Sequence, residues 1–243
     1  MPAPATTPRN RKSPRWLRRA VVGVVAVLVV VVGGPFVYFH FLEGKTPAKL
    51  SVESVSTSTL APGQKAAPLA GTWKVGSGST VDYRVKETLF DQSHTAVGGT
   101  KSVTGSMTIA ATFVTTASFS VDMTTMTSIG HDHGIRDDQF QHRIMDTADF
   151  PTATFVLTSP IEIGAGPKDG VKTPYTATGK FTLHGTTKTI TFPVKARRTA
   201  NVIAVQGDVP VTFSDYGIDN PSGGPATVGN AGQMEFVLEL SPS

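Results

Sequence analysis

The chain has 243 residues, 39% hydrophobic and 16% charged, which is enough for one good core with an appended segment but too few for two large domains. Its formal net charge is +4, but six of the 22 Lys and Arg residues precede Glu43, the first acidic residue, so the remainder holds 16 basic and 18 acidic residues and gives little support to a nucleic-acid partner. The absence of cysteine excludes a disulfide framework and a thiol nucleophile.

The first 42 residues have the pattern of a single membrane-spanning helix. Residues 1–19 are a basic tail, and residues 20–38 carry no charge. At about 1.5 Å per residue, this stretch reaches about 28 Å, close to the hydrocarbon thickness of a bilayer. By the positive-inside rule, we expect residues 1–19 in the cytoplasm, an anchor over residues 20–42, and the rest of the chain outside the cell membrane. A cleaved signal peptide is the alternative, but the apolar run is long and lacks a clear small-x-small cleavage site.

Residues 43–70 are rich in Ser, Thr, Pro, Ala and Lys and have no apolar periodicity, which predicts a flexible linker. A short extra strand around residues 50–55 is the alternative. From Gly71 onward, hydrophobic and polar residues alternate between turn signals. Residues 71–243 are therefore predicted to form one β domain.

The alternation identifies about eight strands. Their apolar faces are Val81, Tyr83 and Val85; Val103, Met107 and Ile109; Phe119, Val121 and Met123; a strand over residues 152–163; Phe181 and Leu183; Ile190, Phe192 and Val194; Val209, Val211 and Phe213; and Phe236, Leu238 and Leu240. Residues 184–187 read as a tight hairpin between the fifth and sixth of these strands. One interval, residues 134–145, places Ile135, Phe140 and Ile144 at roughly helical spacing before Pro151, which predicts one short inserted helix.

Eight antiparallel strands with clean alternation and one short helix favour a closed up-and-down barrel. An immunoglobulin-like sandwich is the alternative, weakened by the missing Cys pair and core Trp. An eight-stranded barrel is either filled by its side chains or wide enough for one small ligand. The residues alone leave both interiors open.

Four stretches of the domain carry recognisable motifs in a fixed order. They are residues 71–105, from Gly71-Thr72-Trp73 to Val103-Thr104-Gly105; Arg136-Asp137 with Asp146, Phe150-Pro151 and Phe155; residues 179–187; and residues 214–218. Together they resemble the YceI family of bacterial lipocalin-like proteins over nearly all of residues 71–240. The chain departs from that family's pattern at Gly78-Ser79, where many members have His before Ser, and at Asp138-Gln139-Phe140, where x-His-Leu usually follows the Arg-Asp pair.

The resemblance implies an all-β, lipocalin-like barrel whose elongated apolar interior holds one long-chain lipid, such as a polyisoprenoid, an isoprenoid quinone or a fatty amide. Ten residues are candidates for contact with that lipid: Val81, Tyr83, Met107, Phe119, Met123, Phe155, Phe181, Phe192, Phe213 and Arg136. For the nine apolar residues, the alternative is an ordinary solid core. For Arg136, whose guanidinium suits a phosphate headgroup, the alternative is a salt bridge that fixes the helix against the barrel.

The most metal-like feature is His131-Asp132-His133, to which Asp138 and His142 could add ligands. Its alternative is a solvated junction in which Asp132 caps the helix, and we predict no metal and no cofactor. Catalytic residues are not predicted either, because no G-x-S-x-G, H-E-x-x-H or Ser-His-Asp arrangement is recognisable.

The expected function is non-enzymatic binding, storage or transport of a long-chain isoprenoid-type lipid at the outer face of the membrane. The alternatives are a metal-dependent or lipid-modifying enzyme, and a solid-core structural or stress-related envelope module.

Overall fold

The computed structural model describes residues 46–55, 60–61, 63–89, 92–130, 133–223 and 226–243, together with Arg19, Gly23 and Val27. The chain divides into two compact units, Met1–Gly44 and Lys45–Ser243. In the first unit, the three described residues have helical backbone. The rest of the anchor expected over residues 20–42 lies outside the described residues. Within the described residues, no helix is both long and apolar enough to cross a membrane.

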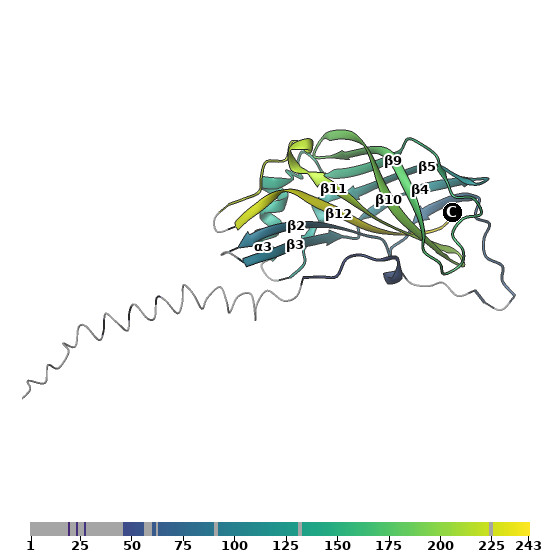
Figure 1. Cartoon of the computed structure of the whole chain (residues 1–243), viewed down its shortest axis with the longest axis horizontal. Helices are drawn as coiled ribbons and strands as arrows, with labels where there is room; N and C mark the ends of the chain where they lie inside the picture. Colours follow the sequence, from purple (N-terminus) through teal and green to yellow (C-terminus); the bar gives the residue numbers. More distant parts are fainter. Residues whose placement is uncertain are drawn as a thin grey trace, which may run out of the picture. The chain divides into compact units, whose positions relative to one another are not determined.

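The second unit is an antiparallel β-barrel (Figure 1). Its strands are β1 (Gly71–Val75), β2 (Thr80–Leu89), β3 (Gln92–Thr100), β4 (Val103–Ala110), β5 (Phe113–Asp122), β6 (Thr127–Ser128), β7 (Thr152–Leu157), β8 (Ile161–Glu162), β9 (Thr173–Leu183), β10 (Thr186–Thr199), β11 (Val202–Thr212) and β12 (Ala226–Pro242). The helical segments are the 3-10 turns η3 (Val52–Ser54), η4 (Met123–Thr125) and η6 (Phe213–Tyr216), the helix α3 (His133–Asp138) and its π-helical continuation η5 (Gln139–Ile144).

The strands follow one another around the barrel in sequence order. The consecutive strands β1 and β2 both pair with β12, so together they occupy one strand position. On their other side, β1 pairs with β4 and β2 pairs with β3, so β3 and β4 together occupy the next position. The described strands therefore fill eight positions in the order β1/β2, β3/β4, β5, β7, β9, β10, β11, β12. The pairing of Val75 in β1 with Leu240 in β12 closes the ring. The predicted eight-stranded closed barrel is confirmed, and the sandwich alternative is wrong because a sandwich consists of two separate sheets.

Two local differences from the predicted strands have clear causes. The strand expected over residues 152–163 is divided into β7 and β8, because Pro160 between them has no N–H to donate to a ladder. Strands β1, β3 and β6 lie outside the predicted set; in β3, Gly98-Gly99 and a run of polar residues obscure the alternation. The hairpin between β9 and β10 is confirmed: Leu183 pairs with Thr186, and His184 and Gly185 take the positive φ values of a two-residue turn.

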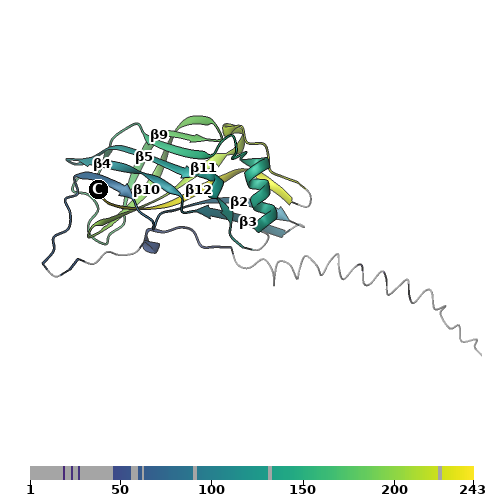
Figure 2. The same ribbon diagram turned by 180° about the vertical axis from the view of Figure 1, so that it is seen from behind.

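The inserted helix is confirmed and covers one end of the barrel (Figure 2). Its second half is π-helical, and the Met145 N–H donates to the Phe140 carbonyl at 2.9 Å. Phe140 is buried, and its ring stacks on Tyr83 with centroids 5.0 Å apart. The Gln141 side-chain amide donates to three carbonyls of residues 123–126, which ties the helix to η4. Ile135, which the helical spacing grouped with Phe140 and Ile144, is 69% exposed.

Residues 46–55, expected to belong to a flexible linker, pack on the outer face of the barrel, and we call this segment the strap. Val52 and Val55 are buried there against Ala204 and Val237. The Arg197 guanidinium donates to the carbonyls of Val52 and Val55 at 2.6 and 3.1 Å. The strap contains the single turn η3 rather than an extra strand. Its few apolar residues suffice because they cover an apolar patch that β11 and β12 leave on their outer face.

The strap also buries charged residues that the alternation of β2 and β12 directs outward. The Arg84 Nε and Glu235 Oε1 atoms are 2.7 Å apart, and both side chains are buried. Arg84 also donates to the carbonyls of Pro47 and Ala48 at 2.8 and 2.6 Å. Burial, and then the neighbouring Glu235 carboxylate, raise the pKa of the adjacent Asp82 carboxyl to about 6, although Arg84 opposes the shift.

Asp82 should therefore make the stability of the barrel depend on pH. Its folded-state pKa lies above the usual 3.8, so ionisation of Asp82 destabilises the folded state: this cost is absent below about pH 4, grows as the pH rises, and is complete above about pH 6. We expect Asp82→Asn to raise the free energy of unfolding by about 1 kcal/mol at pH 8, after allowance for solvent screening, and to change it little at pH 4. Urea unfolding followed by near-UV circular dichroism measures both values.

The control for this experiment is Asp208→Asn, since the Asp208 side chain is 43% exposed and lies 3.9 Å from the Lys49 amine. The same gain at both pH values for Asp82→Asn, or an equal gain for the control, would contradict the assignment of the shifted pKa to Asp82.

Candidate functional site

The interior of the barrel contains two cavities that lie end to end. The space open to the centres of water molecules is about 140 Å³ in the first and about 160 Å³ in the second. Val81 lines the first cavity, and Tyr83, two residues further along β2, lines the second. On β11, Val209 lines the first cavity and Val211 lines the second, and Met234 lines both. Because residues two apart share one face of a strand, the cavities succeed each other along the barrel.

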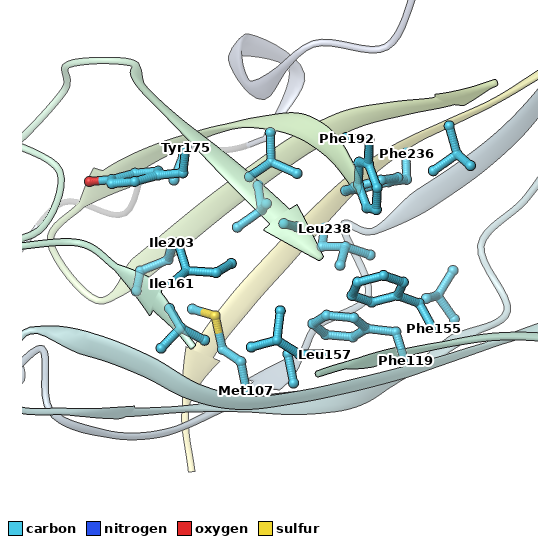
Figure 3. A pocket seen from close by; sticks show the side chains of 18 of the residues that line it. Met107, Phe119, Phe155, Leu157, Ile161, Tyr175, Phe192, Ile203, Phe236 and Leu238 are labelled. Atoms are coloured by element: carbon cyan, nitrogen blue, oxygen red, sulfur yellow. The ribbon is translucent and has the colours of Figure 1, made fainter. Parts of the chain in front are cut away.

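The wall of the first cavity is almost entirely hydrocarbon. Thr154 and Tyr175 are the only residues among those lining it that carry a polar side-chain group. The Phe192 ring meets the rings of Phe155 and Phe236 edge to face, at centroid distances of 5.4 and 6.1 Å. Figure 3 shows these rings and Phe119 around the same space. A cavity with so few donors and acceptors disfavours ordered water and charged groups but suits a hydrocarbon chain.

Small residues keep the interior open, and sequence reasoning missed them. Ala117, Ala153, Ala177 and Ala196 line the first cavity. A Cβ atom at Gly207 would lie 2.5 Å from the Phe236 ring, and one at Gly98 would lie 2.4 Å from the Tyr83 ring. Each glycine is the cross-strand partner of the ring that covers it. The available signal was glycine inside a strand, which marks a close approach of other atoms to the backbone.

All ten residues singled out from the sequence line one of the two cavities. Those in the first are Val81, Met107, Phe119, Phe155, Phe181 and Phe192. Those in the second are Tyr83, Met123, Phe213 and Arg136. Several second-cavity residues come from the inserted helix and from the segment that follows β5, including Phe140, Ile144 and Met126. Sequence periodicity identified large inward-facing residues, but it did not separate one cavity from the other.

The second cavity has a polar end, to which β2 and the helix contribute. The Arg136 Nη2 atom lies 2.7 Å from the Glu87 Oε1 atom, and the His94 Nε2 atom lies 3.8 Å from that same oxygen. Burial lowers the pKa of His94 despite the nearby Glu87, so the imidazole is neutral at pH 7. Burial also raises the pKa of the Tyr83 phenol, whose hydroxyl is 3.1 Å from the Ser128 hydroxyl. This end therefore places the Arg136–Glu87 pair and the Tyr83 hydroxyl beside a cavity whose remaining lining is mostly apolar.

The structure describes only part of the metal-like feature formed by His131-Asp132-His133, Asp138 and His142. Residues 131–132 and the side chain of His133 lie outside the described part of the chain. The Asp138 and His142 side chains are 3.7 Å apart and exposed to solvent. In the part of the chain that the structure describes, no group of three or more His, Asp or Glu residues could hold a metal ion.

Comparison with known proteins adds a family and a fold. A family model described as a YceI-like domain matches residues 73–240. A polyisoprenoid-binding domain from Saccharophagus degradans, implicated in plant cell wall breakdown, is similar in structure with a TM-score of 0.56 and 16% identity, over 72% of this chain and 99% of that one. BcnA from Burkholderia cenocepacia gives a TM-score of 0.53 and 20% identity, over 68% and 98% of the two chains. At these identities the likeness shows the fold alone. No curated protein matches the chain.

Proposed function

The chain belongs to the YceI-like domain family, and from this premise we propose that its barrel binds, and thereby stores or transports, one long-chain isoprenoid-type lipid without changing it chemically. The observation that carries the proposal is the pair of cavities end to end, apolar for most of their length and polar at one end. The similar Saccharophagus degradans domain is named for polyisoprenoid binding, which supports the same ligand class.

The size of the interior limits the length of the lipid. At roughly 10–15 Å³ for each methylene-sized sphere, the two cavities together hold on the order of 20–30 carbon atoms. Burial of each methylene contributes about 0.8 kcal/mol to binding. Five methionines line the cavities, namely Met107, Met123, Met126, Met145 and Met234. Their flexible thioethers can repack around chains of slightly different length.

The site of action in the proposal is the outer face of the cell membrane. The basic tail over residues 1–19 and the uncharged residues 20–38 support a single-pass anchor with a cytoplasmic N-terminus. An anchored barrel stays close to its supply of lipid, because tethering raises the effective concentration without new contacts. Carbonate extraction of membranes tests the anchor: the chain is expected to stay in the pellet, and its release would contradict a membrane span.

A titration with isoprenoid alcohols of graded length tests the binding function. We expect saturable binding to the full chain in detergent that is tightest at about 20–30 carbon atoms, since shorter chains bury fewer methylene groups and longer ones exceed the cavity. An absence of binding at every length would contradict the proposal.

The role proposed for Arg136 is to hold the helix on the barrel rather than to bind a headgroup. Its partner Glu87 has a side chain that is only 9% exposed, so Arg136→Ala leaves a nearly buried carboxylate without its ion-pair partner. We expect the variant to lose about 2 kcal/mol of stability while keeping its lipid. The control is Arg143→Ala on the same helix, where the guanidinium donates to Pro221 in a solvent-exposed contact. Lipid loss at unchanged stability for Arg136→Ala would instead assign the guanidinium to the headgroup.

A further inference from the structure

The first cavity reaches the end of the barrel away from α3, and we call this the far end. Around it, Gly71 on β1 pairs with Ile109 on β4. Val114 on β5 pairs with both Ile109 and Ile161, and these three apolar side chains all line the first cavity. Met123, which follows β5 and lines the second cavity, lies roughly 25–30 Å from Val114 along the strand direction. The two cavities therefore extend toward opposite ends of the barrel.

A residue of the segment before β1 closes the far end. Leu69 lines the first cavity but is only half-buried, so its side chain separates the cavity from solvent. A Cβ atom at Gly166 would overlap the Leu69 side chain, and the φ of +81° at Gly166 is one that glycine adopts readily. Ile163 and Pro167, on the loop that contains Gly166, line the same cavity. We call Leu69, Ile163 and Pro167 the cap.

Arg198, near the end of β10, holds both segments of the cap in place. Its guanidinium donates to the Ala67 carbonyl, and its own carbonyl accepts from the Gly170 N–H at 2.8 Å. The guanidinium carbon also lies 5.7 Å from the centre of the Trp73 ring. The Trp73 indole N–H in turn donates to the Leu69 carbonyl at 2.8 Å. Because these hydrogen bonds reach the cap segments through main-chain atoms, replacement of the Leu69 side chain leaves them in place.

The charged groups of the interior lie at the end opposite the cap. Arg136 and Glu87 form an ion pair beside the second cavity, which Tyr83 also lines. Of the described residues that line the first cavity, none is charged. Tyr175 directs its hydroxyl away from the Phe155 ring (Figure 3). Because an unpaired polar group is costly in an apolar cavity, this arrangement favours the second cavity for a lipid headgroup and the cap for the hydrocarbon end.

We propose that Leu69 is the stop that sets the longest lipid chain the barrel accepts. The inference rests on the proposed lipid binding and adds a determinant of chain length to it. A chain that reaches Leu69 cannot extend further unless it displaces this side chain, so additional carbon atoms stay in water and gain no burial energy. Leu69 precedes residues 73–240, which the family model matches, so the stop comes from outside the matched domain.

Titration with isoprenoid alcohols that differ by one isoprene unit tests the stop. The natural full chain in detergent is compared with Leu69→Ala. We take the alcohol that is one unit longer than the one the natural chain binds most tightly. It is expected to bind Leu69→Ala at least about tenfold more tightly than it binds the natural chain, since each further buried methylene favours binding about fourfold. Alcohols too short to reach Leu69 are expected to bind both proteins equally.

Two controls accompany the variant. Leu69→Met keeps a side chain of similar volume and is expected to keep the natural length preference. Val171→Ala shortens an aliphatic side chain that is 50% exposed, on the same loop as Ile163 and Pro167, and should also leave the preference unchanged. The natural length profile in Leu69→Ala, or an equal loss of affinity at every length, would overturn the stop and leave lipid binding intact. No binding of any alcohol by the natural chain would contradict the function and the stop together.

A crosslinking measurement on the natural chain does not depend on how any variant folds. The isoprenoid alcohol that binds most tightly is prepared with a photoreactive diazirine at its hydrocarbon end. After irradiation, the crosslinked residues are identified by peptide mass spectrometry, and we expect them to be Leu69 and residues of the loop over 163–167. Crosslinks confined to residues of the second cavity, such as Phe140 and Met145, would place the hydrocarbon end away from the cap and overturn the stop.

Discussion

Replacement of Ala117 by Phe is expected to remove the lipid from the barrel while the barrel stays folded. Ala117 lies on β5, is 8% exposed and lines the first cavity. The added ring would take up about half of a space that holds about ten carbon-sized groups. A lipid that fills both cavities would lose several methylene contacts, at about 0.8 kcal/mol each, so the lipid content should fall at least about tenfold.

The stability of the same variant distinguishes a hollow barrel from a solid core. A real cavity accommodates the ring, so the melting temperature of the lipid-free protein should stay the same or rise. In a solid core, the ring would overpack the interior and cost about 1–3 kcal/mol. The matched control is Ala110→Phe, an exposed position at the end of β4, which should change neither the lipid content nor the stability. Lipid retained at the normal amount in Ala117→Phe would contradict the cavity as the binding site.

Arg84→Ala is expected to be the most destabilising single substitution considered for this barrel, at about 3–5 kcal/mol, because removal of one partner leaves a buried charge uncompensated. Glu235 is 1% exposed, and Asp82 beside it is also buried, so two carboxylates would lose their nearest cation. The amine of Lys49 is 3.5 Å from Glu235, but this side chain is 58% exposed and compensates only weakly. The carbonyls of Pro47 and Ala48 would lose their donor as well.

Hydrogen exchange at the strap separates a local effect from a global one. The amides of Leu50 and Val52 donate to Glu235 and Gln206, so their exchange should accelerate in Arg84→Ala before the barrel unfolds. The double variant Arg84→Met/Glu235→Leu should recover part of the stability, since apolar residues of similar volume often replace a buried ion pair without loss, whereas Asp82 and the carbonyls of Pro47 and Ala48 still lack their partner. A cost below about 1 kcal/mol for Arg84→Ala would show that the ion pair and the strap contribute little.

The barrel was predictable because its signals are local. Alternation along β2, β4, β5 and β9 to β12 depends on one buried face per strand, and the hairpin at His184-Gly185 depends on two adjacent residues that adopt positive φ. The strap was not predictable in the same way. Its Val52 and Val55 are too few to give a period, and their partners Ala204 and Val237 are about 150 to 180 residues away in the sequence. Long-range burial of this kind becomes visible only in the folded chain.

The candidate site was predictable in its large residues but not in its open space. The alternation that contains Phe155, Phe192 and Phe213 predicts that these side chains point into the barrel, but it does so whether the interior is filled or hollow. What makes the interior hollow is the placement of small residues, such as Ala117 and Gly207, opposite large ones across neighbouring strands. This pairing depends on strand register, which hydrophobic alternation restricts to one face but does not fix residue by residue.

Native mass spectrometry of the full chain, released from detergent micelles, tests the central claim most directly. The natural sequence is expected to carry one isoprenoid-type lipid of about 20–30 carbon atoms, whereas Ala117→Phe is expected at the mass of the polypeptide alone. The variant serves as the control for lipid that adheres to the anchor, because both proteins keep the same N-terminal segment. A natural chain at its polypeptide mass, unchanged after incubation with isoprenoids of that length, would contradict the account.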